Sequence, residues 1–175
     1  MKVRFEIYCL GYRTTTPELY VAWGTLLKAI TDDGREQVIT KAGPLDNTIT
    51  KNVADLLAVA KALQCIKPEF RINSDVVIYT PPGYAYQMLE RQANGAWGTE
   101  PNKNADAVGA MREMATKYNR LEIRRGEPNS KPFKQVVELL QKWVSDARMG
   151  TNKGTGQVPS STETARTPVS RPSKT

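Results

Sequence analysis

The start of one expected helix carries the polar side chains that are best suited to binding or catalysis. Residues 50–64 repeat apolar side chains at i, i+3, i+4, i+7 and i+10, which is typical of an amphipathic helix. Thr50 or Asn52 can cap its first turn, because a short side-chain oxygen accepts a hydrogen bond from an otherwise unpaired backbone N–H. Asp55 is expected in the same turn, where the helix dipole favours a carboxylate. A hydroxyl, a carboxamide and a carboxylate should therefore lie close together.

Missing residue types exclude several kinds of catalysis. The chain has no histidine, which excludes His-based nucleophilic triads, His general bases and zinc sites with His ligands. The two cysteines, Cys9 and Cys65, are far apart in apolar segments and are expected to be reduced core residues. No apolar run approaches the ~20 residues of a membrane span. We therefore expect a cytoplasmic protein without a membrane partner.

Charge and composition divide the chain into a domain and a tail. The formal net charge is +7, and +3 of it belongs to residues 151–175, where four basic residues face one acid. A basic excess fits a polyanionic partner, and it equally fits a solubilising surface. Residues 1–147 have the composition of one globular domain. Residues 148–175 are rich in Ser, Thr, Pro and basic side chains, so they are expected to form a flexible, disordered basic tail.

Hydrophobic alternation and turn residues predict the order strand, strand, strand, helix, strand, helix, helix, strand, helix. Asp32-Asp33-Gly34-Arg35 indicates a hairpin, so the first three strands should be antiparallel. The order predicts an α/β domain in which helices flank both faces of a mixed five-stranded sheet. The expected strands are 2–10, 19–30, 37–40, 72–80 and 120–124, and the expected helices are 50–64, a short one from Tyr84, one around 108–118 and one capped by Ser130.

Several motifs, taken in order, resemble type 1 ribonuclease H over roughly residues 1–147. The sharpest is Thr50-Lys51-Asn52-Val53-Ala54-Asp55-Leu56, where the family has T-N-N-x-x-E-L. Val77-Ile78-Tyr79-Thr80, followed by Gly83-Tyr84, is similar to the family's fourth strand and the helix after it. Asn102 to Asp106, with Trp97 shortly before, is similar to the family's N-A-D-L helix start. The resemblance implies an RNase H-like fold.

The resemblance also implies where a metal site should lie. Family members cut the RNA strand of an RNA–DNA hybrid with two magnesium ions held by four carboxylates. Asp55 stands at the position of the helix glutamate, one methylene shorter. The other three positions fall on Leu10, Pro81 and Val137, which cannot bind a cation.

Two further carboxylates, Glu6 and Glu138, are candidates to replace the missing ligands. Neither restores the central aspartate, and Glu127 replaces the family's mobile histidine. We therefore expect a catalytically inactive member that needs no cofactor, with Mg²⁺ required only if catalysis is retained.

Nucleic-acid binding could persist without metal. In the family, the Thr and Asn of this helix start grip a DNA phosphate and RNA 2′-hydroxyls, and Thr50 and Asn52 stand at the matching positions. Recognition of an A-like duplex depends on shape and 2′-OH contacts. Taken singly, each candidate is also an ordinary cap or surface side chain. The candidate nucleic-acid-binding residues are Thr50, Lys51, Asn52, Tyr84, Arg124, Arg125 and Lys131.

Three functions fit these observations. The first is a catalytically inactive protein that binds an RNA–DNA hybrid or another A-like duplex, with the tail adding non-specific affinity. The second is a protein–protein interaction module, in which Leu10, Pro81 and Val137 form an apolar docking face. The third is an active ribonuclease H with an altered metal site. Divergence from the family pattern, together with the tail, also suggests a viral or phage origin.

Overall fold

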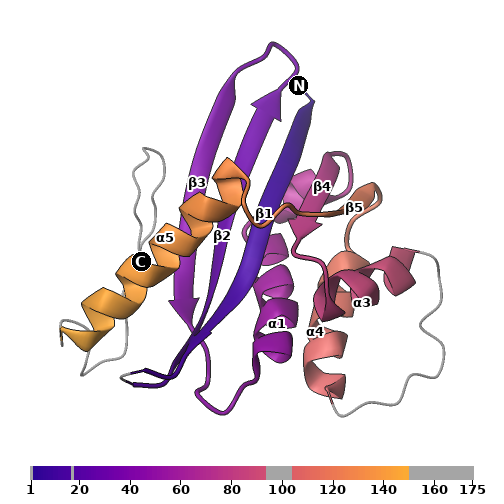
Figure 1. Cartoon of the computed structure of the whole chain (residues 1–175). Coiled ribbons are helices and arrows are strands. Elements are labelled where there is room, and N and C mark those ends of the chain that lie inside the picture. Colours follow the sequence, from indigo (N-terminus) through magenta and orange to yellow (C-terminus); the bar gives the residue numbers. More distant parts are fainter. Residues whose placement is uncertain (1, 17, 94–103, 150–175) are drawn as a thin grey trace.

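A mixed five-stranded sheet forms the centre of the structure, a computed structural model that describes residues 2–16, 18–93 and 104–149. The strand order is β3-β2-β1-β4-β5. Strands β1, β2 and β3 are antiparallel, whereas β4 runs parallel to β1 and β5 parallel to β4, as the element order predicts (Figure 1). The elements are β1 (Val3–Thr14), β2 (Tyr20–Thr31), β3 (Glu36–Pro44), α1 (Lys51–Gln64), α2 (Pro68–Arg71), β4 (Asp75–Thr80), α3 (Tyr84–Ala93), α4 (Ala105–Ala115), β5 (Leu121–Arg125) and α5 (Lys131–Arg148).

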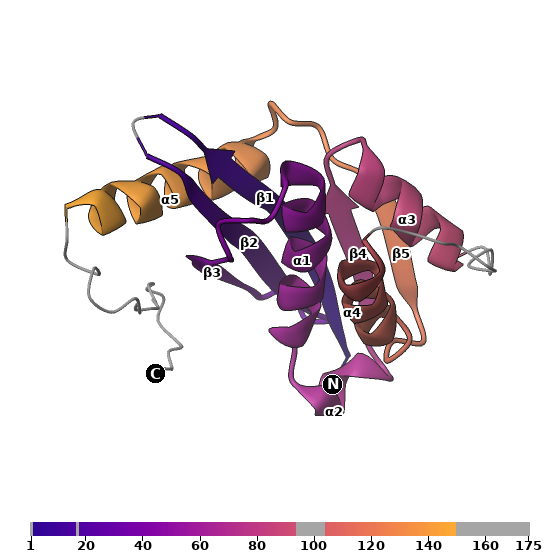
Figure 2. The same cartoon turned by 90° about the horizontal axis from the view of Figure 1, so that it is seen from below.

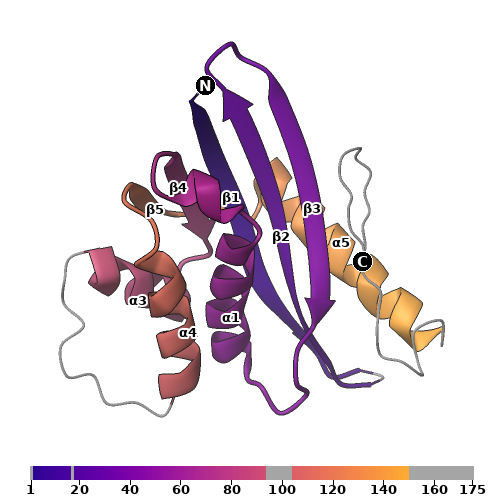
Figure 3. The ribbon, with the colours of Figure 1, turned by 180° about the vertical axis from the view of Figure 1, so that it is seen from behind.

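Alternation along β1 divides the core between the two faces of the sheet. Ile7 and Cys9 belong to the cluster that packs against α1 and α4, whereas Tyr8 and Leu10 pack on the opposite face against α5. Figure 2 shows the sheet between these helical layers, and Figure 3 shows α1 and α4 from their own side. The expectation of helices on both faces is therefore confirmed.

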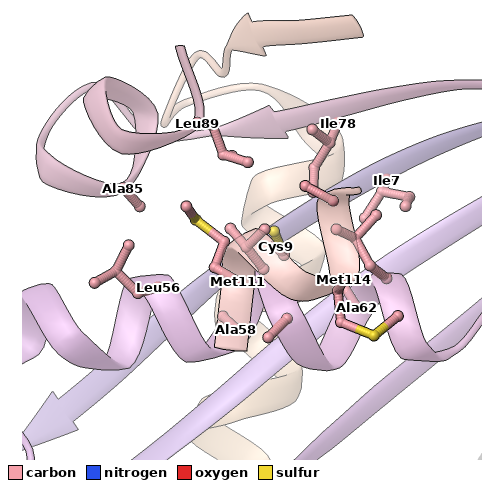
Figure 4. Packing of buried hydrophobic residues seen from close by; sticks show 14 of the residues in the cluster. Ile7, Cys9, Leu56, Ala58, Ala62, Ile78, Ala85, Leu89, Met111 and Met114 are labelled. Atoms are coloured by element: carbon pink, nitrogen blue, oxygen red, sulfur yellow. The ribbon is translucent and has the colours of Figure 1, made fainter. Parts of the chain in front are cut away.

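The larger cluster explains the apolar stripe of α1. Leu56 and Leu63 are fully buried, and Leu56 lies in one cluster with Ile78 of β4 and Met111 of α4 (Figure 4). Burying one such side chain is worth about 1.5–3 kcal/mol. Packing against the sheet and α4 therefore holds α1, and with it the polar residues at its start.

Three strand boundaries differ from the sequence prediction by three residues or more, and one of them is the end of β3, which lies at Pro44 and not at residue 40. Strand β1 does not turn at Gly11, because its pairing with β2 continues through Thr14. A Cβ atom at Gly11 would lie 2.4 Å from the backbone carbon of Ala54, so glycine here permits β1 to pass close to α1. Strand β4 begins at Asp75 and not at Ile72, because residues 72–74 form the turn that follows the short helix α2, an element that the sequence pattern did not predict.

The expected helix caps are partly correct. Thr50 is the N-cap of α1, and its side chain accepts a hydrogen bond from Val53 N. Asn52 is not a cap, since it lies inside the helix. The first turn contains no acidic residue, so Asp55 lies beyond it, contrary to expectation. Ser130 occupies the N-cap position of α5 without making a side-chain capping bond.

Other expectations concern thiols, membranes and the C-terminal segment. Cys9 is buried and Cys65 partly buried, and both are free thiols. Among the described residues, no helix has the length and apolar character needed to cross a membrane. Of the expected tail, residues 148–175, Arg148 is still the last residue of α5 and Met149 is its C-cap. Residues 150–175, Trp97 and Asn102 lie outside the described residues, so what we expect of them stays a prediction.

Candidate nucleic-acid interface

One edge of the sheet brings the sequence motifs together. β1 and β4 are parallel neighbours, so their carboxyl ends lie at the same edge. There, Gly11 of β1 donates its backbone N–H to Asp55 Oδ1 of α1 over 2.7 Å. Gly126, in the connection from β5 to α5, donates its N–H to the Thr80 carbonyl over 2.7 Å. The ends of β1 and β4, the first turns of α1 and the connection to α5 thus meet at one place.

Both carboxylate oxygens of Asp55 have partners within the protein. Lys51 Nζ lies 2.8 Å from Asp55 Oδ1 and 2.9 Å from Oδ2. The Asp55 side chain is only 15% exposed, whereas that of Lys51 is 50% exposed. With the Gly11 N–H as a second partner, the carboxylate is balanced by an ammonium group and joined to the backbone of β1. In this arrangement it links two elements of the fold.

The other positions of the expected metal site are apolar. Leu10 is 8% exposed and packs with Phe133 and Val136 of α5, and Val137 lies partly buried against the same cluster. Because Leu10 is buried, the expected apolar docking face is not presented to solvent there. Within the described ranges, the large hydrophobic side chains that are exposed lie elsewhere, at Val38, Phe70, Ile72 and Met149.

Among the described residues, neither replacement carboxylate shares a bonding partner with Asp55. Glu6 precedes Leu10 by four residues on β1, a separation of about 13 Å along a strand. It is held there by Arg4 Nη1 and by the Tyr8 hydroxyl, each 3.3 Å from a Glu6 oxygen. Glu138 is exposed on α5, whose buried face instead carries Phe133, Val136, Leu140 and Val144.

These residues do not fit a two-magnesium centre. Hard cations require several carboxylate or other oxygen ligands that converge on one point. Across the described parts of the chain, no group of three or more His, Cys, Asp or Glu side chains could hold a metal ion. The one carboxylate at the expected position already has a lysine as its counter-ion.

An aromatic stack that the sequence pattern did not predict lies next to this edge. The rings of Tyr8 and Tyr79 stack with centroids 4.6 Å apart and an interplanar angle of 3°. Phe133 meets Tyr8 edge-on, with centroids 5.7 Å apart. Burial, reinforced by the negative charge of Glu6, raises the pKa of Tyr8 to about 12. The available signal was the alternation that places Tyr8 and Tyr79 on one face, but their pairing also depends on the parallel register.

Three consecutive candidates face solvent at the start of α1. Thr50, Lys51 and Asn52 are all exposed, although Thr50 also caps the helix and Lys51 pairs with Asp55. They lie beside the edge formed by the ends of β1 and β4. These three side chains are thus accessible to a ligand, and their role in nucleic-acid binding stays a prediction.

Arg124 and Arg125 are not brought together. Neighbouring residues of a strand point to opposite faces. Arg124 Nη2 lies 2.6 Å from Glu122 Oε2, whereas the Arg125 guanidinium lies 5.4 Å from the centroid of the Tyr86 ring on α3. A single duplex surface would therefore meet at most one of these two guanidinium groups directly.

The remaining candidates begin two helices. Lys131 is exposed as the first residue of α5. Tyr84 is partly buried as the first residue of α3, and its hydroxyl accepts a hydrogen bond from Asn104 Nδ2 over 3.2 Å. Asn104 was not singled out as a contact residue. Its position directly before α4, which packs against α1, was the signal that could have identified it.

Comparison with known proteins establishes the fold. No family model matches the chain, and no curated protein sequence matches it. The structure of RNase H1 from the halophilic archaeon Halobacterium salinarum NRC-1 matches with a TM-score of 0.56 and 22% identity, covering 79% of this chain and 98% of that one. The chain has a ribonuclease H-like fold.

Two further structures support this fold assignment. The N-terminal RNase H domain of a Mycobacterium tuberculosis protein, solved as a fusion with maltose-binding protein, gives a TM-score of 0.52 and 15% identity over 83% of this chain and 99% of that one. Prototype foamy virus protease–reverse transcriptase gives a TM-score of 0.51 and 17% identity, covering 78% of this chain and 20% of that one. At these sequence identities the similarity establishes the fold, and any activity has to be argued from the residues of the site.

Proposed function

We propose that this ribonuclease H-like chain binds an RNA–DNA hybrid, or another A-like duplex, at the start of α1 and does not cleave it. The observation that carries the proposal is the combination found in the first turns of α1. Thr50, Lys51 and Asn52 are exposed there, while Asp55 is held by Lys51 and by the Gly11 N–H. The polar groups suited to duplex contacts remain accessible, and the carboxylate suited to metal binding is already neutralised.

The absence of cleavage follows from the ligand requirement of the chemistry. Two-metal hydrolysis needs carboxylates that hold both ions and thereby stabilise the attacking and leaving oxygens. Leu10 and Val137 offer no ligand atoms, and the described residues contain no alternative group of metal-binding side chains. Binding has no such requirement, since A-like duplexes are recognised by shape, phosphates and 2′-hydroxyls.

Affinity should be moderate and sensitive to salt. Lys51 and Lys131 are exposed cations at the starts of α1 and α5, and of these Lys51 pairs with Asp55, as Arg124 does with Glu122. A few phosphate contacts give a slope of about −2 to −4 for log K against log salt concentration. Arginine and lysine contacts of this kind position a duplex without reading its sequence.

The test is fluorescence anisotropy with a labelled RNA–DNA hybrid in EDTA, with matched double-stranded DNA and RNA alongside. Asn52→Ala removes an exposed carboxamide from the start of α1, and Gln64→Ala removes one from the last residue of the same helix. If Asn52 donates or accepts one hydrogen bond to the duplex, its loss weakens binding about two- to tenfold. Gln64→Ala should leave affinity unchanged.

Cleavage is measured on the same hybrid after Mg²⁺ or Mn²⁺ replaces EDTA. Salt-sensitive binding with no product would support the proposal. Product formation that Asp55→Asn abolishes would show an active nuclease and refute the claim that the chain does not cleave. Absence of binding by the wild-type protein to all three duplexes would refute the binding claim.

A further inference from the structure

We propose that Lys51 is a built-in counter-cation for Asp55, so that nucleic-acid binding by this chain is independent of divalent metal ions. This inference rests on the proposed function and adds its ion dependence. In a metal-dependent member of the fold, acidic groups at this edge would repel a phosphate backbone until cations neutralise them. Here the neutralising charge is covalently part of the chain.

The geometry of the pair supports this role. The Lys51 ammonium is within 2.9 Å of both Asp55 oxygens, and the Gly11 N–H approaches Oδ1 as well. The carboxylate is largely buried while half of the lysine side chain is exposed. Asp55 therefore presents little negative charge to solvent, and the accessible side of the pair is positive.

Helix stability does not explain a lysine at this position. Lys51 is the first residue of α1, where the positive end of the helix dipole disfavours a cation. The order Lys then Asp at i and i+4 is also the less favourable orientation for such a pair. A positive charge placed against the dipole, beside exposed Thr50 and Asn52, instead favours an approaching anion.

A plain phosphate contact by Lys51 makes a different prediction from a counter-cation. If Lys51 only touched phosphate, the loss in affinity would not depend on Asp55. If Lys51 neutralises Asp55, its removal exposes an uncompensated carboxylate to the duplex, and removal of the carboxylate charge restores binding. The double variant Lys51→Met with Asp55→Asn separates the two cases, because both of its side chains stay close to native size.

The experiment measures hybrid affinity in EDTA and in Mg²⁺ at equal ionic strength, using the full chain. The variants are Lys51→Met, Lys51→Met with Asp55→Asn, and Lys61→Met, which removes an equal charge from an exposed position in the last turn of the same helix. We expect Lys51→Met to bind about two- to fivefold more weakly than Lys61→Met in EDTA, the range for one partly exposed charge pair. Mg²⁺ should recover part of this loss, and the double variant should bind like Lys61→Met without a response to Mg²⁺.

Several results would overturn the inference. These are equal binding by Lys51→Met and Lys61→Met, a double variant as weak as Lys51→Met, or wild-type binding that strengthens on addition of Mg²⁺. Failure of the wild-type chain to bind the hybrid in EDTA would remove the proposed function itself, and this inference with it. The wild-type measurement thus distinguishes the two failures. Circular dichroism melts of each variant establish that the compared proteins are folded.

Discussion

Gly11 and Asp55 join the first strand to the first helix, through a hydrogen bond of 2.7 Å from the Gly11 N–H to Asp55 Oδ1. Gly11 has no Cβ, and the backbone of Ala54 occupies the space where one would lie. The close approach of β1 to α1 therefore depends on both residues. Glycine permits the approach, and the carboxylate satisfies a backbone donor that the approach would otherwise shield from water.

Asp55→Ala should destabilise the fold more than Asp55→Asn. Alanine leaves the Gly11 N–H without its acceptor, which costs about 1–3 kcal/mol when the donor is buried. Asparagine retains an oxygen for Gly11 and loses the ion pair with Lys51, a partly exposed pair worth about 0.2–1 kcal/mol. Urea denaturation of both variants measures the difference in unfolding free energy. Equal destabilisation would mean that the hydrogen bond to Gly11 contributes little.

Gly11→Ala should lower stability by about 1–3 kcal/mol or more, the usual range for overpacking a close contact. The added methyl group would lie 2.5 Å from Ala54 Cβ and 2.7 Å from Asp55 N, so β1 and α1 would have to separate. Gly109→Ala is the matched control, because its new Cβ meets nothing within 4 Å and its helix should gain up to about 1 kcal/mol. Thermal unfolding of both variants checks the opposite signs. A neutral Gly11→Ala would contradict the tight contact.

The order and layering of the fold were predictable from sequence because they depend on local patterns. Thr50 lies next to an apolar stripe of helical period, and Asp33-Gly34 separates two strands rich in β-formers, so each element was recognisable alone. The motifs around Thr50 and Tyr79 then fixed the order. Helix α2 was missed because four residues between Lys67 and Ile72 carry too little periodicity.

The contents of the site were less predictable, because they depend on contacts between distant segments. Asp55 was correctly placed on α1, but its bond to Gly11 required knowing that β1 continues past residue 10. The stack of Tyr8 on Tyr79 required the register of two parallel strands. Arg124 and Arg125 could have been separated by strand alternation alone, since adjacent residues face opposite sides.

Ionisation of Tyr8 should reduce stability at alkaline pH. Burial, followed by the charge of Glu6, raises the Tyr8 pKa from 10.0 to about 12. A group whose folded-state pKa is raised stabilises the fold fully below its unfolded pKa, and this contribution is lost as pH rises from 10 to about 12. Tyr118, whose pKa is also raised to about 12 by burial, adds a second contribution with the same sign.

Tyr8→Phe separates the two tyrosines. Unfolding free energies measured between pH 9 and pH 12 should fall less steeply for this variant than for the wild type. Ultraviolet titration of the folded protein should also lose one late-ionising phenol. Identical pH profiles for variant and wild type would contradict the raised Tyr8 pKa.

Leu10→Asp places a carboxylate where the sequence resemblance to type 1 ribonuclease H predicts one, and we expect it to unfold the domain rather than create a metal site. Leu10 is 8% exposed and packs with Ala22, Leu26 and Phe133. Leu10→Ala should cost about 2–5 kcal/mol. Aspartate is also smaller than leucine, and its burial adds the cost of desolvating a charge. Leu10→Asp should therefore destabilise the fold more than Leu10→Ala. Because burial favours the protonated form of such a carboxyl, the excess cost of aspartate over alanine should shrink as pH falls.

Mg²⁺ should not rescue the variant, since Lys51 already neutralises Asp55. Thermal melts of both variants at several pH values, with and without Mg²⁺, check these expectations, and stabilisation of Leu10→Asp alone by Mg²⁺ would show that this edge can still assemble a cation site.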